Sequence, residues 1–396
     1  MRVLLIDVTC KVGSTGKIVY DLYTELKNQG HVAGIAYGRG PQVNEPNIFK
    51  FGLDMETAFH ALMNRITGIH GSFSLISTIR LIRFIEKFNP DVIHIHELHG
   101  YFVNINMVMN FISKRNIKVI WTFHCEYMYE GKGHVYSDSE DSHWSRKREY
   151  PKSWLLDFSK WSVKRYKKSF EKFNNLTIVS PSNWLANRIK NTYLNRFDIR
   201  VINNGINQEI FKPKDASYLI QKHCLFNKKI ILSVAPNLMG EHKGGKRVLE
   251  LANMLKDTPY HFILIGVKED EVEQHDNVLM IPRTENQSIL ADYYSLADIF
   301  LILSVRENFP TTCIESLSCG TPIVGFDTGG TSETAVYPYG KFFEYANLNE
   351  IKEYLLSDFV MNKETITNSI TDYSKKYSKM NMLDSYIQLY LIGDNY

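Results

Sequence analysis

Residues 304–333 constrain the fold of this chain more than any other stretch. A short apolar run at 299–303 precedes them, and its length and β-compatible composition predict a buried strand of a parallel sheet. Glu307 follows the carboxyl end of this strand, where open α/β sheets bind their ligands. A helix is expected next, from Cys313 to Cys319. The stretch therefore predicts a doubly wound α/β domain with a binding edge at Glu307.

Two glutamates in this stretch are spaced to share one ligand. Glu315 lies eight residues after Glu307 and one turn inside the expected helix, so both carboxylates can face the same side. Thr311 or Thr312 is the expected N-cap, and backbone amides at 309–311 would offer the positive end of the helix to a phosphate. Carboxylates can accept hydrogen bonds from sugar hydroxyls, and backbone amides can bind a diphosphate, so the two together suit a nucleotide sugar. The alternative is that each glutamate is simply solvated, as an isolated glutamate usually is.

Length and composition narrow the class of protein. The 396 residues suffice for two or three domains, and 44% apolar with 22% charged residues is typical of a globular protein. A net charge of +3 does not indicate a nucleic-acid partner. No apolar run reaches about 18 residues and Met1 leads directly into a strand-like segment, so we expect neither a membrane span nor a signal peptide. Five scattered cysteines predict a reduced cytosolic compartment and no structural zinc; they are Cys10, Cys125, Cys224, Cys313 and Cys319.

The first half of the chain begins with a strand, a glycine-rich turn and a helix. The strand is expected at 3–8, the turn contains Gly13 and Gly16, and the helix follows at 15–29. The spacing is too short for the P-loop and lacks the Rossmann glycine pattern. A phosphate-binding turn and a merely tight turn therefore both stay open.

Histidines gather where two later strands are expected to end. His94 and His96 alternate onto one face of a strand at 91–96, and Glu97 and His99 follow it directly. This quartet can hold a metal ion or form a polar loop that binds an acceptor molecule, and we favour the second interpretation. The residues expected to bind the acceptor are His96, His99 and Tyr101. His124, just beyond a strand at 118–122, is the first-half counterpart of Glu307.

These motifs resemble, in order, those of a known enzyme family. Residues 304–333 are similar to the E-x7-E region of the retaining glycosyltransferases of family 4, with Phe-Pro-Thr at 309–311 in place of the commoner Phe-Gly-Leu. Four further segments resemble the branch that makes colanic acid, capsules and exopolysaccharides: 68–72, 90–94, 99–104 and 121–124. The chain departs from many relatives at Cys125, where they carry Asp, and in the loop at 134–148, which keeps Trp144 but has no cysteine.

The resemblance implies the GT-B fold, in which two Rossmann-like, doubly wound parallel-sheet domains face a central cleft. We expect an acceptor-side domain at 1–203, a linker at 204–228 and a nucleotide-sugar-binding domain at 229–377. The last helix, at 378–396, is expected to return to the first domain.

The resemblance also assigns roles to residues. Glu307 would bind the donor-sugar hydroxyls and support developing positive charge, Glu315 would hold the ribose, and His124 would orient the donor sugar. Lys243 would stabilise the leaving diphosphate. Asn237 stands where the family has Arg, so the diphosphate would depend on Lys243 unless Lys246 or Arg247 compensates. The remaining donor contacts expected are Gly16, Arg283, Asn308, Phe309, Pro310 and Thr311.

The implied reaction is the retaining transfer of a hexosyl or N-acetylhexosaminyl group from a nucleotide sugar, with a UDP-sugar favoured. The acceptor would be a glycan or an undecaprenyl-linked oligosaccharide in bacterial surface polysaccharide synthesis. No Asp-x-Asp ends a strand, so we expect neither a metal nor a resident cofactor. A GT-B phosphorylase or epimerase is a rival activity. From a different class, a catalytically inactive nucleotide-sugar-binding subunit of an assembly complex stays open because Asn237 replaces the usual Arg.

One region suggests a membrane partner. Residues 146–172 include ten Lys or Arg residues and only three acidic residues. Aromatic residues are interleaved with the basic ones along a helix expected at 157–173. A basic amphipathic helix can lie on an anionic membrane surface. An ordinary surface helix with a buried aromatic face explains the pattern equally well. We expect a cytoplasmic enzyme that contacts the inner face of the plasma membrane.

Overall fold

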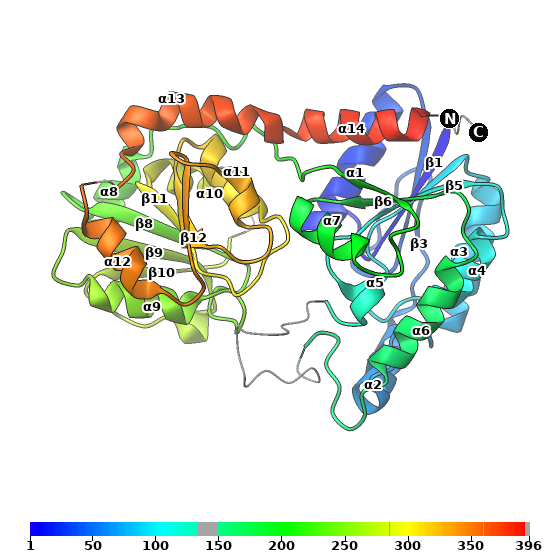
Figure 1. The fold of residues 1–396 in the computed structure, drawn as a ribbon. Coiled ribbons are helices and arrows are strands. Elements are labelled where there is room, and N and C mark those ends of the chain that lie inside the picture. Colours follow the sequence, from blue (N-terminus) through cyan, green and yellow to red (C-terminus); the bar gives the residue numbers. More distant parts are fainter. Residues whose placement is uncertain (134–148, 285, 359, 393–396) are drawn as a thin grey trace. The chain divides into compact units, whose positions relative to one another are not determined.

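The computed structural model describes residues 1–133, 149–284, 286–358 and 360–392, and the chain divides into two compact units (Figure 1). The first unit comprises Met1–Ile202 together with Leu383–Tyr396, and the second comprises Asn203–Met382. Each unit is built on its own parallel sheet with helices on both faces.

The first sheet has seven strands in the order β3-β2-β1-β4-β5-β6-β7, and all its strand pairs are parallel. Its central strands are buried on both faces, which explains their continuous apolar runs. In register, Val3 of β1 pairs with Ala33 of β2 and with Val92 of β4. The strand order reverses at β1, so the carboxyl ends of β1 and β4 form the switch point where such sheets bind ligands. The strands are β1 (Arg2–Asp7), β2 (Val32–Tyr37), β3 (Ile48–Lys50), β4 (Val92–Ile95), β5 (Lys118–Thr122), β6 (Leu176–Ser180) and β7 (Asp198–Val201).

Seven helices accompany this sheet: α1 (Gly13–Asn28), α2 (Asp54–Thr67), α3 (Leu75–Phe88), α4 (Ile105–Ile112), α5 (Tyr127–Glu130), α6 (Ser159–Phe170) and α7 (Asn183–Lys190). Helix α1 buries the apolar residues that the sequence places on one face, and Gly30 follows its end with a φ of +78°. Ser182 caps α7 by accepting a hydrogen bond from Leu185 N at 3.1 Å.

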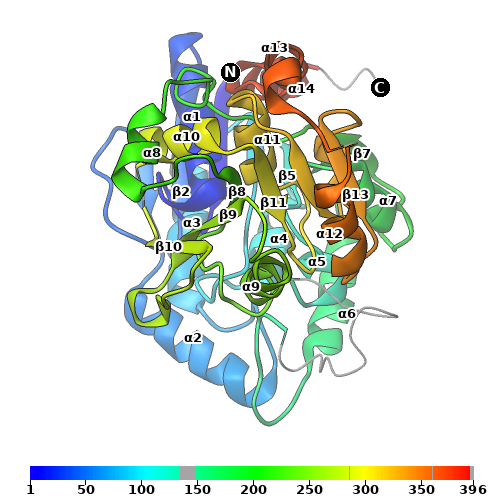
Figure 2. The same ribbon diagram turned by 90° about the vertical axis from the view of Figure 1, so that its left-hand side faces the viewer.

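The second sheet has six parallel strands in the order β10-β9-β8-β11-β12-β13. Successive residues of its strands enter two different apolar clusters, one on each face. Helices α10 and α11 cover one face and α9 and α12 cover the other (Figure 2). The order reverses at β8, so its switch point lies at the ends of β8 and β11. The strands are β8 (Lys229–Val234), β9 (Tyr260–Val267), β10 (Val278–Pro282), β11 (Ile299–Ile302), β12 (Ile323–Phe326) and β13 (Gly340–Phe343).

The helices of the second unit are α8 (Ser217–His223), α9 (Gly245–Met254), α10 (Gln287–Leu296), α11 (Thr311–Ser318), α12 (Leu348–Leu356) and α13 (Lys363–Ser374). The last helix, α14 (Lys379–Leu391), reaches the first unit, where Tyr390 Oη lies 2.6 Å from His94 Nδ1 and Tyr386 Oη lies 3.1 Å from Thr122 Oγ1. These contacts anchor the end of α14 to strands β4 and β5 of the first unit.

The structure differs from the sequence-based expectations in detail. Helix α11 begins at Thr311 with Pro310 as its N-cap and without a side-chain cap hydrogen bond, so neither threonine caps it. Strands β3 and β13 were not expected. Residues 204–228, expected to be a linker, lie in the second unit, contain α8 and add Phe211 and Leu219 to its core.

Two buried histidines of the first unit accept hydrogen bonds from backbone amides. Gly71 N donates to His60 Nε2 at 3.1 Å, and Gly100 N donates to His70 Nε2 at 3.3 Å. Burial lowers the pKa of His60 to about 4 and the pKa of His70 well below its usual value. Since a protonated imidazole has no acceptor nitrogen, both side chains must stay neutral to keep these bonds.

We predict that acid destabilises the first unit through these histidines. In the unfolded chain they titrate near pH 6.5, so below that pH the unfolded state binds more protons and the free energy of unfolding falls. The loss should approach about 1.4 kcal/mol per pH unit for each histidine. Urea denaturation between about pH 7.5 and pH 5 measures it. His60→Gln should flatten this dependence, and equal slopes for the variant and the parent protein would contradict the prediction.

Candidate functional site

In the second unit, two predicted site residues meet at the switch point. Lys243 Nζ lies 2.7 Å from Glu307 Oε1. Lys243 comes from the loop after β8 and Glu307 from the loop after β11, so they are 64 residues apart in sequence but follow adjacent strands. Their side chains are 36% and 17% exposed. The carboxyl edge of this sheet therefore presents a cation and a carboxylate side by side.

A glycine brings these two loops together. Gly244, the N-cap of α9, has a φ of +78°, and a Cβ there would lie 2.1 Å from Leu303 O. Val305 N also donates to His242 O at 3.0 Å across the same contact. Because only glycine fits this approach, the position after Lys243 is determined by packing against the chain that leads to Glu307.

A second glycine holds the backbone of Glu307. Gly329 has a φ of +63°, and a Cβ there would lie 2.0 Å from Glu307 O, while Gly330 N donates to that oxygen at 2.9 Å. The loop after β12 therefore fixes Glu307 through its carbonyl group.

Glu315 lies in α11 and is half-buried. The hydroxyl of the fully buried Tyr294 donates to Glu315 Oε2 at 3.1 Å. Burial, together with this carboxylate, raises the pKa of Tyr294 well above its usual value, so the hydroxyl stays a donor. Sequence reasoning missed Tyr294, because an aromatic residue in an apolar helix carries no signal of its polar contact.

The turn between Glu307 and α11 is well packed. Asn308 is 7% exposed and Phe309 is 4% exposed. Phe309 packs edge-to-face on Tyr377, and its carbonyl accepts a hydrogen bond from Asn204 Nδ2 at 3.2 Å. This packing fixes the start of α11, whose first backbone amides have no acceptor inside the helix and carry the positive end of its dipole.

Two further residues proposed to bind the donor lie in loops at the same edge of the second sheet. Asn237 is exposed in the loop after β8, and Arg283 is exposed just after β10. Of the two candidates to replace the missing Arg, Lys246 is exposed, whereas Arg247 donates to Tyr345 Oη and stacks on its ring. The contact with Tyr345 makes Lys246 the better placed of the two.

In the first unit, Gly16 is buried inside the first turn of α1. A Cβ there would lie 2.6 Å from Thr9 Oγ1, and its carbonyl accepts from Lys11 N at 3.0 Å. Glycine is therefore required by packing within the turn itself. Whether its amide also meets a phosphate stays a prediction.

Asp7 is a buried carboxyl that sequence reasoning did not single out. It ends β1, is fully buried, and its Oδ1 accepts from Glu97 N at 3.1 Å, so it ties the ends of β1 and β4 together. Burial, opposed by backbone hydrogen bonds and reinforced by the Glu97 carboxylate, raises its pKa to about 7. The available signal was an acid at the end of a run of four apolar residues.

His124 is paired with His96. Their atoms Nε2 and Nδ1 lie 3.1 Å apart and their rings stack at 5.4 Å. Burial lowers the pKa of both imidazoles. His96 is only 2% exposed, so the observed role of its side chain is to position His124; its role toward an acceptor stays a prediction.

The histidine quartet is not assembled as a metal site. Both ring nitrogens of His94 are engaged, Nδ1 with Tyr390 and Nε2 with Thr122 Oγ1 at 2.8 Å. Instead, the described residues bring together one trio of metal-ligand types, Glu97, His99 and Cys125, with one atom from each within 4.8 Å of the others.

His99 and Tyr101, the other residues predicted to bind an acceptor, share an aromatic neighbour. The ring of Tyr150 lies 5.5 Å from the ring of His99 and 6.0 Å from that of Tyr101. Burial alone would lower the pKa of His99, but the Glu97 carboxylate, which it contacts, and the Cys125 thiol raise that pKa well above its usual value. A histidine with a raised pKa and two phenol rings are thus close together beyond the end of β4.

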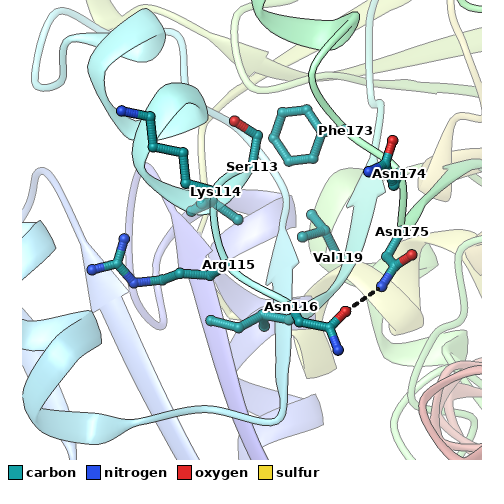
Figure 3. Close-up of a pocket in the computed structure, with 10 residues that line it drawn as sticks. Ser113, Lys114, Arg115, Asn116, Val119, Phe173, Asn174 and Asn175 are labelled. Carbon is teal, nitrogen blue, oxygen red and sulfur yellow. Dashed lines mark hydrogen bonds between the residues drawn. The ribbon is translucent and has the colours of Figure 1, made fainter.

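A pocket of about 290 Å³ lies at the opposite, amino-terminal ends of β5 and β6 (Figure 3). The hydrogen bond from Asn175 Nδ2 to Asn116 Oδ1, at 3.0 Å, lies within it. None of the predicted site residues lines this pocket. Residues 134–148, which include Trp144 and the bases at 146–148, lie outside the described part of the chain.

Comparison with known proteins agrees with this architecture. The Glycosyltransferase Family 4 model matches residues 15–210, and the Glycosyl transferases group 1 model matches residues 215–357. A protein of Escherichia coli K12 named as a colanic acid biosynthesis glycosyl transferase, WcaC, is 22% identical over 98% of this chain and 99% of its own length.

A second relative covers a smaller part of the chain. It is the N,N'-diacetylbacillosaminyl-diphospho-undecaprenol α-1,3-N-acetylgalactosaminyltransferase of Campylobacter jejuni, which is 29% identical over 57% of this chain and 62% of its own length. Among solved structures, Anabaena HepE in complex with UDP-glucose covers 98% of this chain and 99% of its own with a TM-score of 0.66 and 12% identity. The two family models and the two parallel-sheet units show that this chain is a glycosyltransferase of family 4 with the GT-B fold.

Proposed function

We propose that this glycosyltransferase transfers a hexosyl or N-acetylhexosaminyl group, with retention of configuration, from a UDP-sugar to a glycan or an undecaprenyl-linked acceptor. The acceptor belongs to bacterial surface polysaccharide synthesis. Three similarities support this choice: the name of WcaC refers to colanic acid, the Campylobacter relative is named for transfer to an undecaprenol-linked sugar, and HepE is bound to UDP-glucose.

The contact between Lys243 and Glu307 carries the proposal. The ammonium group lies 2.7 Å from the carboxylate at the switch point. When the donor binds, Lys243 turns to the diphosphate, and the amides at the start of α11 share its charge. Glu307 then accepts hydrogen bonds from the sugar hydroxyls and stabilises positive charge at C1. Glu315, oriented by Tyr294, holds the ribose. Asn237, Arg283, Asn308, Phe309, Pro310 and Thr311 complete the donor site in this proposal.

The first unit supplies the groups that act on the sugars. His124, kept neutral by burial and oriented by His96, donates a hydrogen bond to the donor sugar. Gly16 lets the turn after β1 approach the donor phosphate, and His99 and Tyr101 bind the acceptor.

We favour transfer on one face of the donor sugar. The C1–O bond to the diphosphate breaks as the acceptor oxygen bonds to C1 from the same side, and a diphosphate oxygen takes the acceptor proton. Because Lys243 and helix amides provide the positive charge that the leaving group needs, the proposal includes neither a metal ion nor a resident cofactor. It includes no nucleic-acid partner.

The proposed location is the cytoplasm, with contact to the inner face of the plasma membrane. Within the described part of the chain, no helix is both long enough and apolar enough to cross a bilayer. Of the basic region at 146–172, the exposed bases that the structure describes include Lys152, Lys160, Lys164, Lys167 and Lys168.

We predict that Glu307→Gln and Lys243→Met each lower kcat by about 10²–10³-fold, because each removes charge stabilisation from the transition state. Release of UDP from UDP-sugars, without and with a glycan acceptor, measures the effect. Lys212→Met is the matched control, since Lys212 forms an exposed ion pair with Glu209 elsewhere in the same unit. Turnover that survives in both site variants would refute the assigned roles.

A rival function is that of a nucleotide-sugar-binding subunit without turnover, which the loss of the usual Arg at Asn237 favours. We predict that Asn237→Arg lowers the Kd for UDP by about tenfold, because guanidinium bonds to phosphate are strong and bidentate. Isothermal titration calorimetry measures this. If the parent protein binds a UDP-sugar but never releases UDP, the rival function is correct. If Asn237→Arg leaves the Kd unchanged, position 237 does not meet the diphosphate.

A further inference from the structure

The first unit exposes large apolar side chains in two sequence segments, residues 55–79 and 154–161. Trp154 and Leu155 are 62% and 65% exposed, and Met55 is 89% exposed. Such groups are normally scattered singly over a surface, whereas here many come from two short segments. We call them the apolar surface; its members are Met55, Phe59, Leu62, Leu75, Ile76, Ile79, Trp154, Leu155, Leu156, Phe158 and Trp161.

Hydrogen bonds tie both segments to α2. The chain at 154–158 runs along the end of α2, where Leu156 N donates to Ile66 O and Phe158 N donates to Thr67 O, both at 3.1 Å. At the other end of α2, the carboxylate of Glu56 accepts from Ile76 N and Ser77 N, each at 2.8 Å, which ties the start of α3 to α2. Figure 1 shows α2 and also α6, which follows the chain at 154–158 directly in sequence.

The exposed residues of α2 are not part of its core face. Thr57, His60 and Asn64 are the buried residues of this helix, while Met55, Phe59 and Leu62 follow one another at spacings of four and three on an outer face. Among the residues that the structure describes, α2 therefore exposes apolar side chains on a side away from its buried residues, which is typical of a surface that binds a partner.

Basic side chains flank these apolar groups. The guanidinium of Arg65 lies over the ring of Trp154 at 5.1 Å, and that of Arg165 lies over Trp161 at 4.7 Å. Between residues 152 and 172 the chain carries seven Lys or Arg residues and two acids. Apolar groups surrounded by positive charge complement a lipid leaflet with anionic head groups.

We propose that the apolar surface inserts into an anionic membrane leaflet. Trp154 and Trp161 lie at the level of the head groups, where amphipathic aromatic rings are favoured. Leu155, Leu156 and Met55 enter the acyl region. Exposed lysines of α6 contact the lipid phosphates. This inference extends the membrane contact proposed above: it adds insertion through α2, α3 and 154–161 to the basic helix.

The charges argue against a second copy of this chain as the occupant. In a two-fold symmetric dimer the same patch meets itself, so the bases flanking the apolar surface would face one another. An anionic leaflet, in contrast, carries negative charge that attracts these bases, so it is the better partner for the apolar surface.

Co-flotation with vesicles tests the proposal. We expect the full chain to float with phosphatidylglycerol-rich vesicles and to bind phosphatidylcholine vesicles much less. Met55→Asp combined with Leu155→Asp should weaken binding at least about tenfold, because it places two carboxylates among lipid tails. The matched control is Phe226→Asp with Leu356→Asp, which changes two exposed apolar residues of the second unit by the same charge and should bind as the parent does.

A second pair, Lys160→Glu and Lys164→Glu, keeps the test independent of the folding of the first variant. It should weaken binding to the anionic vesicles and make the vesicle affinity less sensitive to salt concentration. Brominated lipids should quench tryptophan fluorescence in the parent, and Trp154→Phe with Trp161→Phe should reduce this quenching.

Three results would overturn the proposal. They are equal binding by the Met55 and Leu155 variant and its control, no binding to anionic vesicles, and a dimer in solution that the same two substitutions dissociate. UDP release from a UDP-sugar, measured without vesicles, reports the proposed function separately, because these substitutions lie outside the proposed donor site.

Discussion

The close approach of backbone at two glycines is the constraint that brings Lys243 and Glu307 together at the carboxyl edge of the second sheet. Gly244 can lie against Leu303 O only because it lacks a Cβ, and Gly329 lies against Glu307 O for the same reason. These two contacts place the loops after β8, β11 and β12 against one another. Lys243 reaches Glu307 as a consequence, and not through any local sequence relation, since 64 residues separate them. The absence of a Cβ at Gly244 and Gly329 therefore allows the cation of Lys243 and the carboxylate of Glu307 to lie together.

At the switch point of the first unit, the strand ends are held together by buried polar side chains. Asp7 receives the amide of Glu97, His94 joins Tyr390 to Thr122, and His96 holds His124. Buried groups of this kind keep their contacts only in one protonation state, and burial lowers the pKa of each of these histidines. The second unit instead presents the cation of Lys243 beside a carboxylate. The first unit presents His94, His96 and His124, whose pKa values are lowered by burial and whose hydrogen bonds have direction.

Much of this was readable from the sequence, and the omissions have physical causes. Buried parallel strands are continuous apolar runs, so β5 could be predicted with the bounds observed. The edge strands β3 and β13 escaped because they have three or four residues and are partly exposed. The carboxylates Glu307 and Glu315 were recognisable from their spacing around a strand and a helix. Tyr294 was not, because its polar partner is distant in sequence, and the only signal for Asp7 was its place at the end of an apolar run. The pairing of Lys243 with Glu307 likewise required the strand order, which no single segment contains.

The departure at Asn237 and the apolar surface become related if the acceptor is attached to a lipid. An enzyme held at a membrane meets a lipid-linked acceptor at a high local concentration. Because the acceptor site is then occupied more of the time, the same rate of transfer can be sustained with a lower affinity for the soluble donor. In the proposed scheme the cation of Lys243 and the dipole of α11 suffice for the diphosphate, and the missing guanidinium is tolerated. Exposed Trp154, Leu155 and Met55 would then serve the reaction at a distance, by determining where the chain works and leaving the chemistry at C1 to Glu307 and its neighbours.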